Sequence, residues 1–182
     1  MQVFTANREQ NTPDELWLLE HESVYTQGQA GKPEHLLNSG NIPVVQTDRG
    51  GQITWHGPGQ LMVYALLDTH RLNLGARALV NRLEKILMAV LDSFGIASYT
   101  KSDAPGVYVL HHGVEAKIAA LGLRVKKNGC YHGAALNIDC DLAAFAGINP
   151  CGYADQAVTR LIDVLPQLPS RADIEQCVIE EF

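Results

Sequence analysis

A long amphipathic segment set among short apolar runs is the feature that most constrains the fold of this chain. Over residues 75–94, apolar side chains recur at helical spacing, and Gly95 follows as a stop signal. These apolar positions are Ala76, Leu79, Val80, Leu83, Leu87, Val90, Leu91 and Phe94. Short runs typical of strands lie around the segment, at 42–45, 60–67, 107–110, 114–125 and 131–138. The pattern predicts a helix that packs against a sheet.

The turns between these runs predict how the strands pair. His112-Gly113 and the Lys-Asn-Gly triplet at 127–129 are typical of tight hairpins, since Asn-Gly supplies the positive φ that such turns need. We therefore expect antiparallel neighbours in the middle of the chain. Helical patterns follow at 142–145, 154–165 and 170–180, the last with Ser170 as its N-cap. The sequence predicts an α/β (α+β) fold with a mixed, largely antiparallel sheet packed with helices.

Residues 12–25 fit two structures. The segment at 12–15, Thr-Pro-Asp-Glu, has the form of a capping box at the start of a helix, whereas the Leu-Trp-Leu-Leu run at 16–19 suits a buried strand. Periodicity leaves both alternatives open.

Length and composition indicate a single domain over residues 1–182. A chain of 182 residues that is 46% hydrophobic can bury a core without metal or disulfide staples. Its formal charge of −6 argues against general nucleic-acid binding. Because no apolar run is long enough for a membrane span or a signal peptide, we expect a cytoplasmic protein that binds neither nucleic acid nor membrane.

The densest cluster of glycines lies at residues 49–60, with the sequence RGGQITWHGPGQ. Glycines at this density let the backbone approach a ligand closely, and the flanking Arg49 and His56 add a cation and a titratable ring. A hairpin with a glycine-rich turn explains the same composition. The order of residues is not that of a phosphate-binding loop.

Lys117 stands near the start of a predicted strand. Strict alternation places it on the same face as Ala119 and Leu121. A desolvated ammonium has a lowered pKa and can act as a base or as the partner of an anion. The alternative is that Lys117 only extends its charged end to water.

Cys151 lies between a proline and a glycine, ahead of a predicted helix. A thiol on such a turn, near a helix N-terminus or a cation, is favoured as a nucleophile. His132, followed by small residues, competes with Lys117 for the role of its base. The other cysteines, Cys130, Cys140 and Cys177, are expected to be buried, reduced and inert, and no histidine or cysteine spacing indicates a metal site.

Four motifs occur together in the order and at the spacing of a known family. They are RGGQITWHGPGQ at 49–60, KIAALG at 117–122, HGAALN at 132–137 and NPCG at 149–152. They resemble the octanoyltransferases of lipoate biosynthesis, and the segments at 20–21, 26–28 and 103–108 look like the same family. The resemblance covers nearly the whole chain. It implies the α/β domain that lipoate ligases share with biotin protein ligases.

The resemblance also implies a reaction, its partners and its residues. An octanoyl group passes from octanoyl-acyl carrier protein, through an enzyme thioester and without a cofactor, to a specific lysine of lipoyl domains. The acceptors are 2-oxoacid dehydrogenase E2 subunits and the glycine cleavage H protein. Carried over by position, Cys151 is the nucleophile, Lys117 activates it, and His132 is a supporting candidate. The substrate pocket maps onto Arg49, Gly50, Gly51, Gln52, Ile53, Thr54, Trp55, His56, Ala120, Leu121, Gly122, Gly133, Ala134 and Ala135.

Two departures from the family pattern accompany this match. Trp55 stands where the family usually has tyrosine, which keeps an aromatic wall but removes a hydroxyl. The family's N-terminal strand and part of its first helix are expected to be missing ahead of Met1.

Two other functions remain to be distinguished. An ATP-dependent lipoate-protein ligase would use a lysine without a paired cysteine, and a non-catalytic lipoyl-domain-binding protein would need neither Cys151 nor Lys117.

Overall fold

Two sheets form the framework of the protein. The computed structural model describes residues 1–150 and 156–182. A six-stranded sheet has the order β1-β5-β9-β8-β7-β6 with every neighbour antiparallel, and a three-stranded sheet has the order β3-β2-β4. The strands are β1 (Glu15–Leu19), β2 (Val24–Gln27), β3 (Val44–Gln46), β4 (Ile53–His56), β5 (Gln60–Leu66), β6 (Ser98–Thr100), β7 (Val107–His111), β8 (Val114–Lys126) and β9 (Gly129–Asn137).

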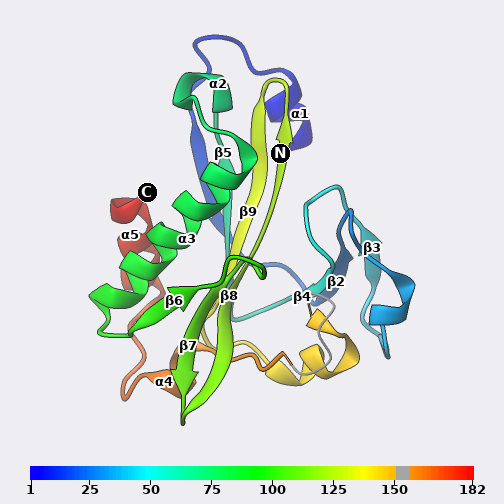
Figure 1. Cartoon of the computed structure of the whole chain (residues 1–182), viewed down its shortest axis with the longest axis vertical. Coiled ribbons are helices and arrows are strands. Elements are labelled where there is room, and N and C mark those ends of the chain that lie inside the picture. Colours follow the sequence, from blue (N-terminus) through cyan, green and yellow to red (C-terminus); the bar gives the residue numbers. More distant parts are fainter. Residues whose placement is uncertain (151–155) are drawn as a thin grey trace.

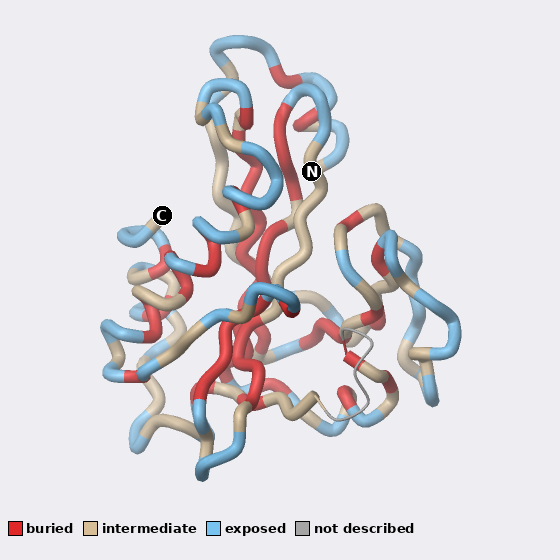
Figure 2. The backbone as a smooth tube through the Cα atoms, in the orientation of Figure 1, coloured by how far each residue is buried: buried red, intermediate tan, exposed pale blue. Residues whose placement is uncertain are grey.

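Two helices, α3 (Ala76–Ser93) and α5 (Arg171–Glu181), cover one face of the large sheet, and the small sheet stands on its other side (Figure 1). The long helix α3 and the C-terminal α5 pack side by side there, over a core that includes Leu87, Leu91, Ile118 and Ile174. Figure 2 shows buried residues concentrated along the central strands. The α-helices are α1 (Gln2–Ala6), α2 (Thr69–Leu72), α3 (Ala76–Ser93), α4 (Leu161–Val164) and α5 (Arg171–Glu181), and 3₁₀ turns span Pro33–His35 and Leu142–Gly147. Within the described residues, no helix is both long and apolar enough to cross a membrane.

Much of the predicted architecture is confirmed. The mixed fold, the long helix at 76–93 and the strands at 60–66, 107–111, 114–126 and 129–137 agree with the expected segments. Ser170 caps α5, its hydroxyl accepting from the backbone N–H of Asp173. The run at 16–19 belongs to strand β1, so the helical alternative for this segment is wrong.

Both predicted hairpin turns are present, but they differ in backbone conformation. His112 and Gly113 both have positive φ, as a two-residue turn of this kind requires. In the β8–β9 hairpin, Lys126 pairs with Gly129, and among its turn residues only Gly129 has positive φ. The positive φ therefore belongs to Gly129, the first residue of β9. Asn128 and Gly129 are not the two central residues of the turn, as an Asn-Gly hairpin turn would require.

One alternative and one prediction for the segments around the candidate motifs are wrong. Residues 49–60 do not form a hairpin, because β4 pairs with β2 in the small sheet whereas β5 pairs with β1 and β9. The described part of the predicted helix at 154–165 is helical only over Leu161–Val164. The preceding backbone pairs instead with Lys117, and such a non-local ladder overrides local helix propensity.

Candidate functional site

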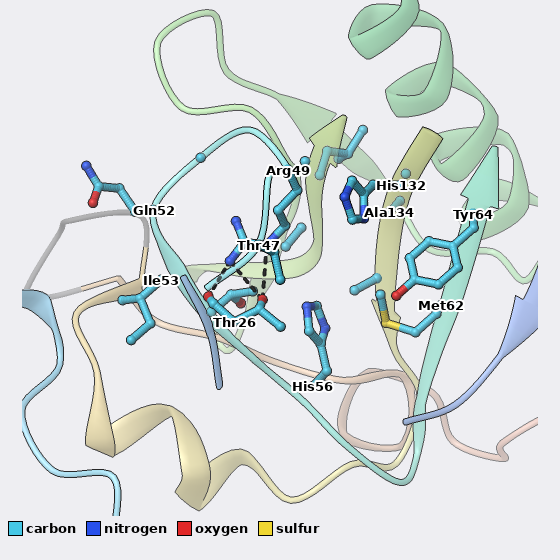
Figure 3. Close-up of a pocket in the computed structure, with 17 residues that line it drawn as sticks. Thr26, Thr47, Arg49, Gln52, Ile53, His56, Met62, Tyr64, His132 and Ala134 are labelled. Carbon is cyan, nitrogen blue, oxygen red and sulfur yellow. Dashed lines mark hydrogen bonds between the residues drawn. The ribbon is translucent and has the colours of Figure 1, made fainter. Parts of the chain in front are cut away.

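A cleft between the two sheets gathers most of the sequence motifs. The small sheet and its loops supply one wall, and β5, β8 and β9 supply the other (Figure 3). Its lining residues are Thr26, Thr47, Arg49, Gly51, Gln52, Ile53, Thr54, His56, Met62, Tyr64, Ala120, Leu121, Gly122, His132, Gly133, Ala134 and Ala135. The lining combines an apolar wall with a few convergent polar groups, which is typical of a small-molecule site.

Small residues paired across β8 and β9 create the hollow. Ala120 lies opposite Ala135, and Gly122 lies opposite Gly133, so that no large side chain fills this part of the sheet face. Gly122 also admits the loop that carries Arg49: a Cβ there would lie 2.8 Å from the Gly50 carbonyl oxygen. The Gly50 N–H donates to the Leu123 carbonyl at 3.0 Å, which holds this loop on β8.

Arg49 links the glycine-rich loop to the small sheet. Its side chain is buried, with Nε 3.0 Å from Thr26 Oγ1 and a terminal nitrogen 2.9 Å from the Gly50 carbonyl. Figure 3 shows the bonds from Arg49 to Thr26 at the edge of the cleft. Arg49 thereby places a positive charge at the cleft and fixes the loop that supports it.

His56 begins a buried hydrogen-bond chain that crosses from one sheet to the other. Because the Thr159 carbonyl can only accept, Asn137 Nδ2 donates to it at 2.9 Å, and Asn137 Oδ1 accepts from Gln60 Nε2 at 2.8 Å. Gln60 Oε1 then accepts from His56 Nδ1 at 2.7 Å. Burial lowers the pKa of His56 to about 3, so the ring is neutral and its Nε2 is a hydrogen-bond acceptor at the cleft.

Replacing Gln60 by leucine is expected to destabilise the fold by roughly 2–6 kcal/mol. The substitution leaves two buried polar atoms, on His56 and Asn137, without their partner, and each such loss costs about 1–3 kcal/mol. Urea denaturation measures the change in unfolding free energy. Gln176→Leu, the same change on the exposed surface of α5, should alter it by less than about 0.5 kcal/mol. If both substitutions changed the unfolding free energy equally, the hydrogen bonds that join His56, Gln60 and Asn137 would have no structural role.

A second polar group occupies the opposite side of the cleft. His132 Nε2 lies 2.9 Å from Asp48 Oδ1, and Tyr131 also donates to the Asp48 carboxylate. Burial alone would raise the pKa of Asp48, but these hydrogen bonds outweigh it and lower the pKa to about 2. His132 has φ +63°, an uncommon conformation for a non-glycine residue. Nearby, His21 Nε2 lies 2.5 Å from the Tyr64 hydroxyl.

Lys117 is buried, with only 3% of its surface exposed, so the alternative of a lysine that reaches water is wrong. Its Nζ donates to the Pro105 carbonyl at 3.1 Å and lies 5.1 Å from the centre of the Tyr108 ring. A bulge in the β7–β8 pairing places Ile118 between two register pairs and interrupts the expected alternation of Lys117 with Ala119. Lys117 does not line the described cleft.

Cys151 lies outside the described residues. After residue 155, the chain runs beside Lys117: the Lys117 N–H donates to the Ala157 carbonyl, and the Thr159 N–H donates to the Lys117 carbonyl.

The other three cysteines are free, as predicted, and Cys130 and Cys140 are buried. Burial raises the pKa of Cys130 and raises that of Cys140 to about 12, which disfavours their thiolates. Cys177 is only partly buried, which differs from the expectation for that residue.

The cleft brings together most of the residues assigned to a substrate pocket, and it adds four that sequence reasoning missed. Gly50 and Trp55 are not among its lining residues. Trp55 points away into a separate core, where it contacts Phe145 edge-on and donates to Ser23. Alternation along β5 from Gln60 could have indicated two missed residues, Met62 and Tyr64. The others, Thr26 on β2 and Thr47 directly after β3, lie outside the motifs and belong to no pattern that marks them as lining residues.

The fold is that of the lipoate-protein ligases. A lipoate-protein ligase A structure bound with ATP superposes with a TM-score of 0.82 at 12% identity, covering 100% of this chain and 76% of that one. The bi-partite lipoate protein ligase of Thermoplasma acidophilum gives 0.79 at 14% identity, covering 100% and 74%.

Sequence comparison identifies the family. The model of the lipoyl protein ligase A/B catalytic domain matches residues 1–182. Proteins named octanoyltransferase from Cellvibrio japonicus and Legionella pneumophila (strain Paris) are each 54% identical, covering 100% of this chain and 83% and 89% of their own lengths. The chain belongs to the lipoyl protein ligase A/B catalytic domain family, and it is an acyltransferase of the octanoyltransferase type.

Proposed function

We propose that this protein transfers an octanoyl group from octanoyl-acyl carrier protein to a specific lysine of lipoyl domains, through a thioester on Cys151. The observation that carries the proposal is the cleft, whose apolar wall and small residues on β8 and β9 suit an acyl chain. The identity to octanoyltransferases supports the same acyl group. The proposed acceptors are lipoyl domains of E2 subunits and the glycine cleavage H protein.

The proposed reaction has two steps. The Cys151 thiolate attacks the donor thioester carbonyl, the carrier's carbon–sulfur bond breaks, and the carrier thiolate leaves with a proton from the Lys117 ammonium. The acceptor lysine amine then attacks the enzyme thioester, an amide forms, and the Cys151 thiolate is released. Lys117 is the proposed partner in both steps, first as an ammonium beside the thiolate and then, once it has given up its proton, as the neutral amine that takes the acceptor amine's proton. Its burial and its backbone pairing with Ala157 and Thr159 support this role.

Intact-mass spectrometry distinguishes the three candidate functions. Incubation with octanoyl-acyl carrier protein should add one octanoyl group to the enzyme, and a lipoyl domain should then remove it without ATP. An ATP-dependent ligase would modify the lipoyl domain only from free octanoate and ATP. A non-catalytic lipoyl-domain-binding protein would leave both proteins unmodified.

Filling the cleft at Ala120 tests whether it holds the acyl chain. Ala120→Leu adds a branched side chain opposite Ala135, so transfer of octanoyl groups should fall by roughly tenfold or more. Transfer of butyryl groups should fall less, because the shorter chain needs less room. Ala172→Leu, on the exposed face of α5, is the matched control. An equal loss with both acyl lengths would contradict binding of the chain in this cleft.

A further inference from the structure

One peptide unit lies between a buried carboxylate and the buried ammonium of Lys117. The carbonyl of Pro105 accepts from Lys117 Nζ at 3.1 Å, and the N–H of Gly106 donates to Glu84 Oε1 at 3.0 Å. The carbonyl and N–H belong to the same planar amide. Glu84, on helix α3, is 6% exposed, and Lys117 is 3% exposed. The two side chains come from different elements, and both are hydrogen-bonded to this peptide.

The orientation of this peptide suits both charges. An amide carries its partial positive charge at the N–H and its partial negative charge at the carbonyl, so the carboxylate faces the positive end and the ammonium the negative end. Hydrogen bonds at the two ends of one amide polarise each other and strengthen together in a low-dielectric interior. Glu84 and Lys117 therefore stabilise each other through this peptide.

The loop that carries the peptide is fixed from several sides. Gly106 has φ +147°, and a Cβ there would lie 2.8 Å from Lys117 Cε and 3.0 Å from the Ala119 carbonyl oxygen. The Tyr108 hydroxyl donates to the Ala104 carbonyl at 2.8 Å and closes the turn. A loop held in one conformation by several contacts is typical of a site that fixes the position of a functional group. The fixed conformation costs backbone entropy, which the surrounding contacts offset.

We propose that Glu84 is a positioning residue for Lys117: through the peptide that joins Pro105 to Gly106, its carboxylate holds the ammonium in place and balances its charge. The catalytic importance of this arrangement rests on the function proposed for Lys117. The geometry itself does not depend on that function. Other charged groups near Lys117 include Glu115, on the same strand, and Lys101, which lies 5.2 Å from the Tyr108 ring centre.

The test compares two Glu→Gln variants. E84Q keeps the size of the side chain and an oxygen that can accept from Gly106, but removes the charge. E115Q removes a carboxylate that bonds to Lys101 and Tyr99 rather than to this peptide. An NMR titration of the Lys117 Cε signal, identified by its loss in K117R, reads the ammonium directly. In E84Q the midpoint should fall by about one pH unit or more, and in E115Q by clearly less.

The pH dependence of single-turnover enzyme acylation provides the second readout. If Lys117 acts as proposed, E84Q should move the alkaline limb of this profile to lower pH, since the ammonium is lost earlier. A residue that only braces the loop would change the melting temperature without moving either titration. Should E84Q melt too early to titrate, Glu84→Met, which is similar in size and apolar, is expected to shift the midpoint in the same direction.

The outcomes distinguish the proposed role of Glu84 from the proposed function of the site. An unchanged Lys117 midpoint in E84Q, or an equal shift in E115Q, overturns the role of Glu84 whether or not the enzyme forms a thioester. A shifted midpoint in a protein that never becomes acylated supports the role of Glu84 and overturns the function proposed for the site.

Discussion

Replacing Cys151 by serine is expected to abolish the acyl-enzyme and to lower octanoyl transfer by on the order of 10³-fold or more. A serine hydroxyl is far less acidic than a thiol, so an ammonium that stabilises a thiolate does not produce an alkoxide at neutral pH. A thioester is cleaved by neutral hydroxylamine. The measurement is the intact mass after incubation with octanoyl-acyl carrier protein, with and without hydroxylamine.

Cys177→Ser is the matched control for this experiment. Cys177 is partly buried on α5, with its sulfur 3.1 Å from the Ser93 hydroxyl, so serine keeps a polar partner there. The C177S protein should form the adduct as the unaltered protein does. A hydroxylamine-sensitive adduct that persists in C151S would assign the nucleophile to another residue.

Local periodicity was enough to predict the elements that depend on nearby contacts. The helix at 76–93 has an apolar face that only helical spacing produces, and β8 and β9 are joined by a short turn, so each could be predicted from adjacent residues. The sheet partner of β4 could not, because a strand's pattern says which face is buried but not which strand it pairs with. A hairpin therefore stayed an open alternative for the glycine-rich run, although its two strands belong to different sheets.

Site residues that lie within one sequence motif could be predicted, whereas those that distant strands bring to the cleft could not. Strict alternation predicted that Lys117 shares a face with Ala119, but a bulge interrupts this alternation, and the burial of Lys117 depends on Pro105, Tyr108 and the segment near Val158. Thr26 and Thr47 reach the cleft only because β2 pairs with β3 and β4. Asp48 meets His132 across 84 positions of sequence, a separation that no local pattern reports.

Replacing Lys117 by alanine should slow acylation by roughly 10²–10⁴-fold and move the alkylation profile of Cys151 to higher pH. A free thiol has a pKa of about 8.5, so little of it is ionised at neutral pH without a nearby cation. The measurement is the rate of iodoacetamide labelling of Cys151 against pH in a C177S background. Cys130 and Cys140 interfere little, because burial raises the pKa of both. Lys117→Met, which keeps more of the buried volume, should shift the profile in the same direction.

His132→Ala is the competing variant, because His132 is the other candidate base. Burial lowers the pKa of His132, and the Asp48 carboxylate offsets only part of this effect. The ring is therefore largely neutral at pH 7 and does not supply the cation that a thiolate needs. H132A should leave the labelling profile nearly in place while Lys117→Ala moves it. If H132A shifts the profile and Lys117→Ala does not, the thiol is paired with His132, and Lys117 serves only to hold the Pro105 loop.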